Sequence, residues 1–158
     1  MKTNPLSVLL AVLGLASMTA AAATPQLFKP EEAHLNLFGT YLNDADKTWG
    51  GGLGFDTFYG NYFGIGVVTH MENLTGTFID NLAAEVTLRI PIQKLHLAPY
   101  VVGGYGYEFD RQEWFQSVGA GAEFRFSENW GIFADYQWVF RNDEENGDYI
   151  RLGVRISL

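Results

Sequence analysis

The last ten residues of the chain alternate between apolar and polar side chains almost without exception. The apolar residues occupy every second position: Ile150, Leu152, Val154, Ile156 and Leu158. Residues 114–126 and 130–141 show the same alternation with few exceptions. A period of two places every apolar side chain on one face of a β-strand. A tilted strand crosses a bilayer with about 9–11 residues, so the pattern predicts long strands with one face in an apolar environment.

Residues 1–23 have the features of a secretory signal peptide. Lys2 precedes an apolar stretch, residues 6–18, which is shorter than the roughly 18 residues of a membrane-spanning helix. Alanines at positions 21, 22 and 23 supply the small residues of a cleavage site. We therefore expect export and cleavage rather than an uncleaved anchor. The chain contains no cysteine, which excludes a lipidated cysteine and a disulfide-stapled secreted domain.

The composition of the remaining chain limits its class. About 135 residues are left, which corresponds to one domain. The 18 acidic residues outnumber the 10 lysines and arginines, and this excludes a basic nucleic-acid-binding surface. No apolar run is long enough for a membrane helix. A chain this polar can cross a membrane only as a closed barrel, in which every backbone group is paired internally.

Alternation and turn residues together predict eight strands. Their ranges are 33–42, 49–59, 62–70, 78–90, 97–108, 114–126, 130–141 and 149–158. Residues 24–32, which contain Pro25 and Pro30, are expected to form an extended lead-in before a barrel over residues 33–158. The third strand can face either way, because the turn at Gly60 can hold two or three residues. The connections alternate between short and longer or more acidic ones, as the periplasmic turns and outer loops of bacterial barrels do.

Alternation alone does not decide whether the apolar face points outward to lipid or inward to a lipocalin-like core. Two features favour lipid. The polar faces combine many glycines with charges of both signs, which suits a narrow lumen. Aromatic residues gather near strand ends, as in the girdles at the lipid–water boundaries: Trp49, Tyr59, Trp114, Phe126, Trp130, Trp138 and Phe140.

Inward-facing charges form a predicted lumen charge ladder. Its members are Glu85, Arg89, Glu123, Arg125, Asp135, Arg151 and Arg155. Ions in a dry interior must be paired, since an unpaired one is very costly, and eight strands leave an interior just wide enough for side chains. We therefore expect structural salt bridges. The alternative interpretation is a gated conduction path that opens when the charges exchange partners.

The segment from Gly119 to Phe126, followed by residues 130–140, resembles the C-terminal half of small outer membrane β-barrels of Gram-negative bacteria. These are the OmpA-like transmembrane domains and the opacity-type, porin-like proteins. The final strand also resembles the assembly signal of that family, whose positions are filled here by Arg151, Gly153, Ile156 and Leu158. Leu158 departs from the usual phenylalanine or tryptophan.

The resemblance implies an all-β protein, an eight-stranded antiparallel up-and-down transmembrane β-barrel in the cell outer membrane. It also implies that the barrel-assembly machinery recognises the last strand during biogenesis. Outer membrane lipids and lipopolysaccharide are the expected partners, and the chain is expected to be a monomer. The acidic loops suggest divalent cations that bridge to lipopolysaccharide phosphates, with ordinary solvated loops as the alternative.

Catalytic chemistry finds little support in the sequence. The three histidines lie on separate segments without metal-ligand spacing, and none of the mature serines sits in a Gly-x-Ser-x-Gly motif. His70 near Asp80 is the nearest candidate pair. We expect no catalytic, cofactor or metal site, and a structural or surface-interaction role in the envelope. The alternatives are a soluble periplasmic lipocalin-like barrel that binds a lipophilic ligand, and an outer membrane enzyme that modifies lipid A.

Overall fold

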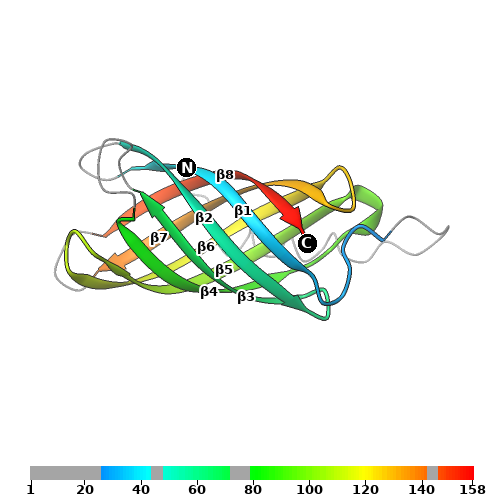
Figure 1. Cartoon of the computed structure of the whole chain (residues 1–158), viewed down its shortest axis with the longest axis horizontal. Helices are drawn as coiled ribbons and strands as arrows, with labels where there is room; N and C mark the ends of the chain where they lie inside the picture. Colours follow the sequence, from blue (N-terminus) through cyan, green and yellow to red (C-terminus); the bar gives the residue numbers. More distant parts are fainter. Residues whose placement is uncertain (1–25, 44–47, 72–78, 142–145) are drawn as a thin grey trace, which may run out of the picture.

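The computed structural model describes residues 26–43, 48–71, 79–141 and 146–158. Within these residues, eight antiparallel strands follow one another in sequence order and close into a barrel, as Figure 1 shows. The strands are β1 (Ala33–Leu42), β2 (Thr48–Tyr59), β3 (Phe63–Met71), β4 (Asn81–Arg89), β5 (Leu97–Glu108), β6 (Glu113–Arg125), β7 (Trp130–Arg141) and β8 (Gly147–Ser157). A short 3₁₀ turn, η2 (Gln93–Leu95), connects β4 to β5. The predicted signal peptide lies outside the described residues.

The predicted fold class is confirmed. The predicted ranges 33–42, 97–108 and 130–141 coincide with β1, β5 and β7, and the other strands differ from prediction by a few residues at their ends. β8 pairs with β1 from Tyr149↔Leu42 to Ser157↔His34, so the barrel has no open edge. Every strand therefore has two neighbours, which pairs its backbone groups as a lipid environment requires.

The turn between β2 and β3 decides the facing of the third strand. Tyr59 pairs with Phe63, so the turn holds three residues. Gly60 and Asn61 both have positive φ, at 63° and 67°, a conformation that glycine and asparagine adopt most readily. The three-residue turn keeps Phe63 on the outward face with Tyr59, and Ile65 follows it there.

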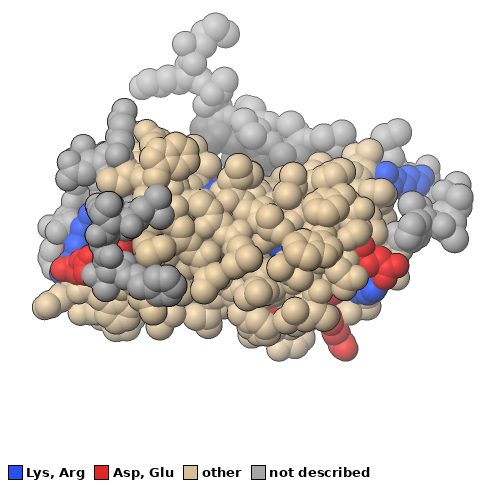
Figure 2. All heavy atoms as spheres, turned by 45° about the horizontal axis from the view of Figure 1, so that its top comes forward, with Lys and Arg blue, Asp and Glu red and all other residues tan. Residues whose placement is uncertain are grey.

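The apolar faces of the strands point outward. On β8, Leu152 is 64% exposed, whereas its neighbour Arg151 is 4% exposed. The same alternation runs along β4 and β7. On the face drawn in Figure 2, a broad belt with very little charge crosses the middle of the barrel, and most of the lysine, arginine and acidic residues lie toward its two ends. This confirms the predicted facing, and the belt matches a lipid-contacting surface. No helix in the described segments is long and apolar enough to span a membrane.

The two ends of the barrel differ. We call the end with the three connections 60–62, 90–96 and 126–129 the turn end, and the opposite end, with the four connections 43–47, 72–80, 109–112 and 142–146, the loop end. The aromatic residues predicted for the girdles are all exposed on the outer face. Some form ring pairs at the loop end, where Tyr41 packs on Trp49 at 4.8 Å and Tyr105 stacks on Trp114 at 5.2 Å.

Large apolar side chains also point inward and fill the lumen between the polar residues. The main interior apolar cluster comprises Phe38, Leu42, Val68, Ala83, Phe115, Phe133, Val139 and Tyr149. Gly153 makes room for part of it. A Cβ atom at Gly153 would lie 2.6 Å from the Cβ of Phe38 and 2.8 Å from the ring of Phe133, closer than packed atoms approach. The interior is therefore packed with side chains.

A charge on the outward face should block membrane insertion. Ala134 is exposed near the middle of β7 and pairs with Ala122 and Leu152. Ala134→Arg places a cation in the lipid and should cost about 2–4 kcal/mol. We expect its refolding yield in lipid vesicles, read from heat-modifiable gel migration, to fall sharply. Ala134→Leu, which is also larger but apolar, should insert normally; equal loss in both variants would contradict the lipid-facing assignment.

Candidate functional site: the charged interior

The interior charges form three clusters along the barrel. The turn-end cluster consists of Glu32, His34, Asp56, Arg89, Glu123, Arg125 and Arg155. The middle cluster consists of Glu85, Tyr100, Asp135, Gln137, Tyr149 and Arg151. The loop-end cluster consists of Glu108, Arg111 and Arg141. Each member projects inward because it lies on the polar face of its strand, except Glu32 and Arg111, which lie outside the strands.

Arg151 organises the middle cluster. From β8, its Nε donates to Asp135 Oδ1 at 2.9 Å, and its Nη1 donates to Glu85 Oε1 at 2.8 Å. The hydroxyl of Tyr100 donates to Asp135 Oδ2 at 2.7 Å. One guanidinium group therefore joins β8 to its neighbour β7 and, across the lumen, to β4.

Arg155 has the same role nearer the turn end. Its Nη1 donates to Glu123 Oε2 at 2.6 Å, and its Nη2 donates to Asp56 Oδ2 at 3.3 Å. Its Nε donates to Asn36 Oδ1 at 2.7 Å. These partners lie on β6, β2 and β1, so Arg155 also connects strands that the backbone ladder does not pair directly.

Glu32, which precedes β1, is a central acceptor in the turn-end cluster. Its two oxygens accept from Arg125 Nη1 at 2.8 Å and Nη2 at 2.9 Å, and Oε2 also accepts from Arg89 Nη2 at 2.8 Å. His34 Nε2 lies 3.2 Å from Oε2. Burial raises the pKa of the Glu32 carboxyl, but hydrogen bonds from these residues outweigh it and hold the pKa well below its usual value.

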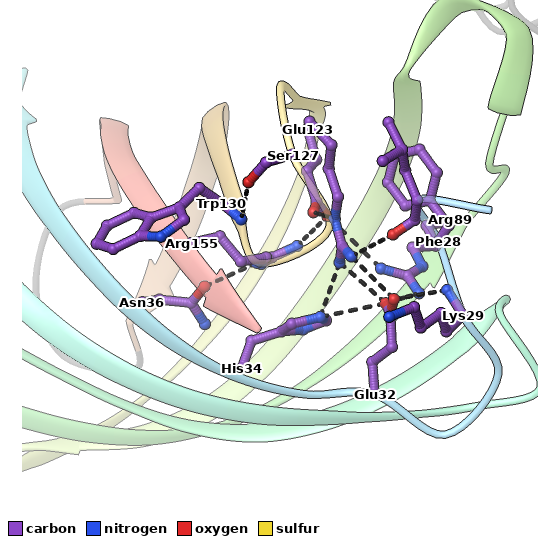
Figure 3. Close-up of polar contacts among 12 residues, drawn as sticks. Phe28, Lys29, Glu32, His34, Asn36, Arg89, Glu123, Ser127, Trp130 and Arg155 are labelled. Atoms are coloured by element: carbon purple, nitrogen blue, oxygen red, sulfur yellow. Dashed lines mark hydrogen bonds and ion pairs between the residues drawn. The ribbon is translucent and has the colours of Figure 1, made fainter. Parts of the chain in front are cut away.

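The segment that carries Glu32 folds back over the turn end, as the close-up in Figure 3 shows. Leu27 and Phe28 are buried there against Ala98. The side chain of Gln93 accepts from the backbone N–H groups of Leu27 and Phe28, at 3.1 and 3.3 Å, and donates to the Phe28 carbonyl at 2.9 Å. The sequence suggested only an extended lead-in for residues 24–32; residues 27–32 in fact cover one end of the interior.

His34 and Asp56 form a close pair, with Nδ1 2.6 Å from Oδ1. His34 is fully buried and packs on the ring of Phe58. Its other nitrogen, Nε2, faces Glu32 and lies 2.8 Å from Arg125 Nη2. Both nitrogens therefore contact protein groups in the interior, and neither presents an open position to a substrate.

The loop-end cluster rests on Glu108. Nη2 and Nε of Arg141 contact its carboxylate at 2.9 to 3.2 Å, and Arg111 adds an ion pair at 2.9 Å. Nearby, His70 Nε2 lies 2.7 Å from the side-chain nitrogen of Asn81. No group of histidine and acidic residues in the described segments has the arrangement of a metal site.

A small cavity of about 20 Å³ lies between the middle and turn-end clusters. Polar side chains line it, including Asp56, Glu85, Tyr100, Arg151 and Arg155. A buried water needs roughly 10–15 Å³ of such space, so the cavity has room for about one water molecule and none for a larger solute.

All seven residues of the predicted lumen charge ladder point into the interior, but they divide between two clusters. Glu85, Asp135 and Arg151 meet in the middle cluster, and the other four lie in the turn-end cluster. Of the residues in the resemblance to an assembly signal, Arg151 and Gly153 face inward, whereas Leu158 is 76% exposed. The sequence analysis missed Glu32, His34, Asp56, Glu108 and Arg141 as members of the interior clusters.

The importance of pairing can be tested at Arg151. Arg151→Met leaves the carboxylates of Glu85 and Asp135 without their cation, and breaking a buried pair costs about 3–5 kcal/mol. We expect the free energy of unfolding, measured with urea in lipid vesicles, to fall by this amount. The triple variant Arg151→Met, Glu85→Gln, Asp135→Asn should recover much of the loss; a triple variant as unstable as the single one would refute the ion-pair explanation.

Glu32 should make stability depend on acid pH. Because its pKa in the folded chain lies below the usual value of 4.5, its contribution is fully present above that pH and is lost as the pH falls below it. The difference in unfolding free energy between the wild-type chain and Glu32→Gln should therefore shrink between pH 7 and pH 3. A difference that stays constant over this range would contradict the depressed pKa.

Comparisons with known proteins agree with this architecture. The family model described as "Outer membrane protein beta-barrel domain" matches residues 7–155. Among curated protein sequences, none matches the chain.

Solved structures of other membrane barrels share the fold. The N-terminal β-barrel domain of Pseudomonas aeruginosa OprF has a TM-score of 0.68 at 15% identity, over 82% of this chain and 98% of that one. A de novo designed transmembrane β-barrel has a TM-score of 0.64 at 21% identity, with the same coverage. Ail of Yersinia pestis, in complex with the heparin analogue sucrose octasulfate, has a TM-score of 0.54 at 13% identity, over 82% and 100%. Because the family model spans most of the chain and the strands close as such a barrel requires, the chain belongs to the outer membrane protein beta-barrel domain family, and so to the outer membrane.

Proposed function

We propose that this protein is a non-enzymatic barrel of the Gram-negative envelope, with a lumen filled by side chains and a structural or surface-interaction role carried by its loops. The observation that supports this most directly is the paired interior. Arg151 and Arg155 each hold two carboxylates inside the barrel. An interior whose charges are paired in this way is expected to act as a fixed core rather than as a passage for solutes.

The loop end is proposed to face the outside of the cell and the turn end the periplasm. Short turns on the periplasmic side and longer loops outside are the rule for such barrels, and here the shortest connection, 60–62, lies at the turn end and the longest, 72–80, at the loop end. The four loops, residues 43–47, 72–80, 109–112 and 142–146, carry eight acidic residues and two basic ones. This negative end suits divalent cations that bridge to lipopolysaccharide phosphates.

A conduction path opened by exchange of ion partners has less support. Phe38 and Phe133 pack edge to face within the lumen, at 6.2 Å between ring centroids. The cavity beside them holds about one water molecule. To open a passage, these rings and the ions around Arg151 would have to move together.

An enzymatic role is also less well supported. The His34–Asp56 pair lies in the interior with its second nitrogen against Glu32 and Arg125. His70 is buried and contacts Asn81. A lipocalin-like binder would need an apolar interior, whereas the apolar faces of this barrel point outward.

Binding of sulfated polysaccharide is not proposed for this chain. Ail, one of its structural neighbours, was solved with a heparin analogue, but at 13% identity that likeness concerns the fold alone. The excess of acidic residues in the four loops would repel a sulfated chain, since like charges disfavour close approach.

Deletion and overexpression test the proposed role in the cell. We expect the protein in detergent-extracted outer membranes with heat-modifiable gel migration, and an unchanged lipid A mass spectrum in both strains. A new lipid A mass that follows the protein level would establish the enzymatic alternative. Recovery in the osmotic-shock fraction would instead support a soluble periplasmic binder.

A further inference from the structure

We propose that the turn-end cluster is a carboxylate-binding site, that Glu32 occupies it as a tethered ligand, and that residues 27–32 form a detachable plug over this end of the lumen. The inference goes beyond the structural role of the barrel. It concerns a ligand site at the end proposed to face the periplasm, and its ligand class is a small carboxylate.

The first support is the convergence of donors on one carboxylate. Two nitrogens of Arg125 and one of Arg89 donate to Glu32 at 2.8 to 2.9 Å, and His34 Nε2 lies 3.2 Å away. Figure 3 shows His34 of β1 and Arg89 of β4 close to Glu32, with dashed contacts that converge on its oxygens. A guanidinium group that binds both oxygens of a carboxylate is a specific recognition geometry.

The second support is the charge balance. Without Glu32, the cluster would hold three arginines, Arg89, Arg125 and Arg155, against the two carboxylates of Asp56 and Glu123. An uncompensated guanidinium in the interior is costly. A site vacated by Glu32 would therefore favour binding of another anion. Arg89 Nη1 is buried without a hydrogen-bond partner and lies 3.6 Å from Glu123, so it is a further donor.

The third support is that contacts outside the plug hold the arginines in place. Arg89 lies over the ring of Phe58 at 3.7 Å, and its Nε donates to the Asn61 carbonyl at 2.7 Å. Arg125 Nε donates to Glu123 at 2.6 Å. These interactions remain when Glu32 departs, so the site stays formed for another carboxylate.

The plug itself is attached in a way that permits release. Its contacts come mainly from side chains: Gln93 binds the backbone at Leu27 and Phe28, and Arg125 donates to the Leu27 carbonyl at 2.6 Å. Only next to β1 does it continue the backbone ladder, where Phe58 N–H donates to the Glu32 carbonyl at 2.7 Å. Detachment would therefore leave the pairing of β1 intact and would uncover Ala98.

The test uses a single cysteine beneath the plug. The chain has no cysteine of its own, and Ala98 is fully buried against Leu27 and Phe28. Ala98→Cys is refolded in detergent and treated with an uncharged, water-soluble disulfide reagent. With Glu32 present, labelling should be slow. In Ala98→Cys, Glu32→Ala it should be about tenfold faster or more, because charge-assisted hydrogen bonds that oppose opening are gone.

Added acetate distinguishes a carboxylate-binding site from a plug that is merely less firmly attached. In Ala98→Cys, Glu32→Ala, added sodium acetate should fill the vacated site and compensate the charges of Arg89 and Arg125 beneath the closed plug. Closure of the plug is then less costly, so labelling should slow again, whereas sodium chloride of equal ionic strength should not have this effect. Lys29→Ala is the matched plug control, because it removes an exposed ion pair between the plug and Glu128, of a kind that contributes little to stability; its labelling rate should change far less than that of the Glu32→Ala variant. Lys94→Cys, exposed at the same end, reports the unhindered reaction.

If Glu32→Ala does not fold, Phe28→Ala in the Ala98→Cys background provides a second test of the plug. It removes an apolar anchor but retains the carboxylate, so labelling of the introduced cysteine should be faster, and acetate should accelerate it further by competing with Glu32. Folding of each variant is checked by heat-modifiable migration. Equal labelling rates with and without these substitutions would overturn the plug. Faster labelling that acetate does not change would overturn the carboxylate site.

Discussion

The structure depends on the pairing of ions in an interior that is nearly closed to water. Each buried arginine of the middle and turn-end clusters lies among carboxylates, amides or backbone carbonyls, and an unpaired ion there would cost several kcal/mol. This requirement also specifies the register of the strands. A slip of one residue would turn Arg151 and Arg155 into the lipid and bring Leu152 and Val154 inside. The outer apolar face and the inner ion pairs are thus two consequences of one alignment.

The interior contacts also connect parts of the barrel that the backbone cannot connect. Hydrogen bonds of the sheet join only neighbouring strands. Arg151 reaches from β8 to β4, and Arg155 reaches from β8 to β6 and β2. Glu32 extends this pattern to a segment outside the sheet, since its carboxylate contacts residues on β4 and β6. The side chains therefore brace the cylinder across its width.

Much of this arrangement could be predicted from the sequence, because a period of two is a direct consequence of strand geometry. The alternation of apolar and polar residues predicted the strands, their apolar faces and the inward direction of Glu85 and Asp135. The facing of β3 could not be predicted, because it depends on the backbone conformation at Gly60 and Asn61, which permits turns of different length. His34 lies on the inward face of β1 and was accessible to the same reasoning.

The inward position of Glu32 could not be predicted from the alternating pattern. It lies outside any alternating stretch, and its neighbours Pro30 and Glu31 give no indication that the chain turns back at this point. Its position depends on contacts with residues far along the sequence. Gln93 holds the segment through its backbone, and Arg89 and Arg125 donate hydrogen bonds to the carboxylate. Local patterns carry no information about partners that are brought together only when the barrel closes.

The pairing of β1 with β8 has a consequence for how the molecule forms. Asn36 and Arg155, which meet at this seam, are 119 residues apart in the sequence, and contacts between distant residues are slow to form. Until the last strand arrives, β1 has an open side, and the carboxylates of Glu85 and Asp135 lack the cation of Arg151. Partly assembled intermediates are therefore poorly stabilised. Pairing of β8 with β1 closes the barrel, so the whole chain folds cooperatively in that step.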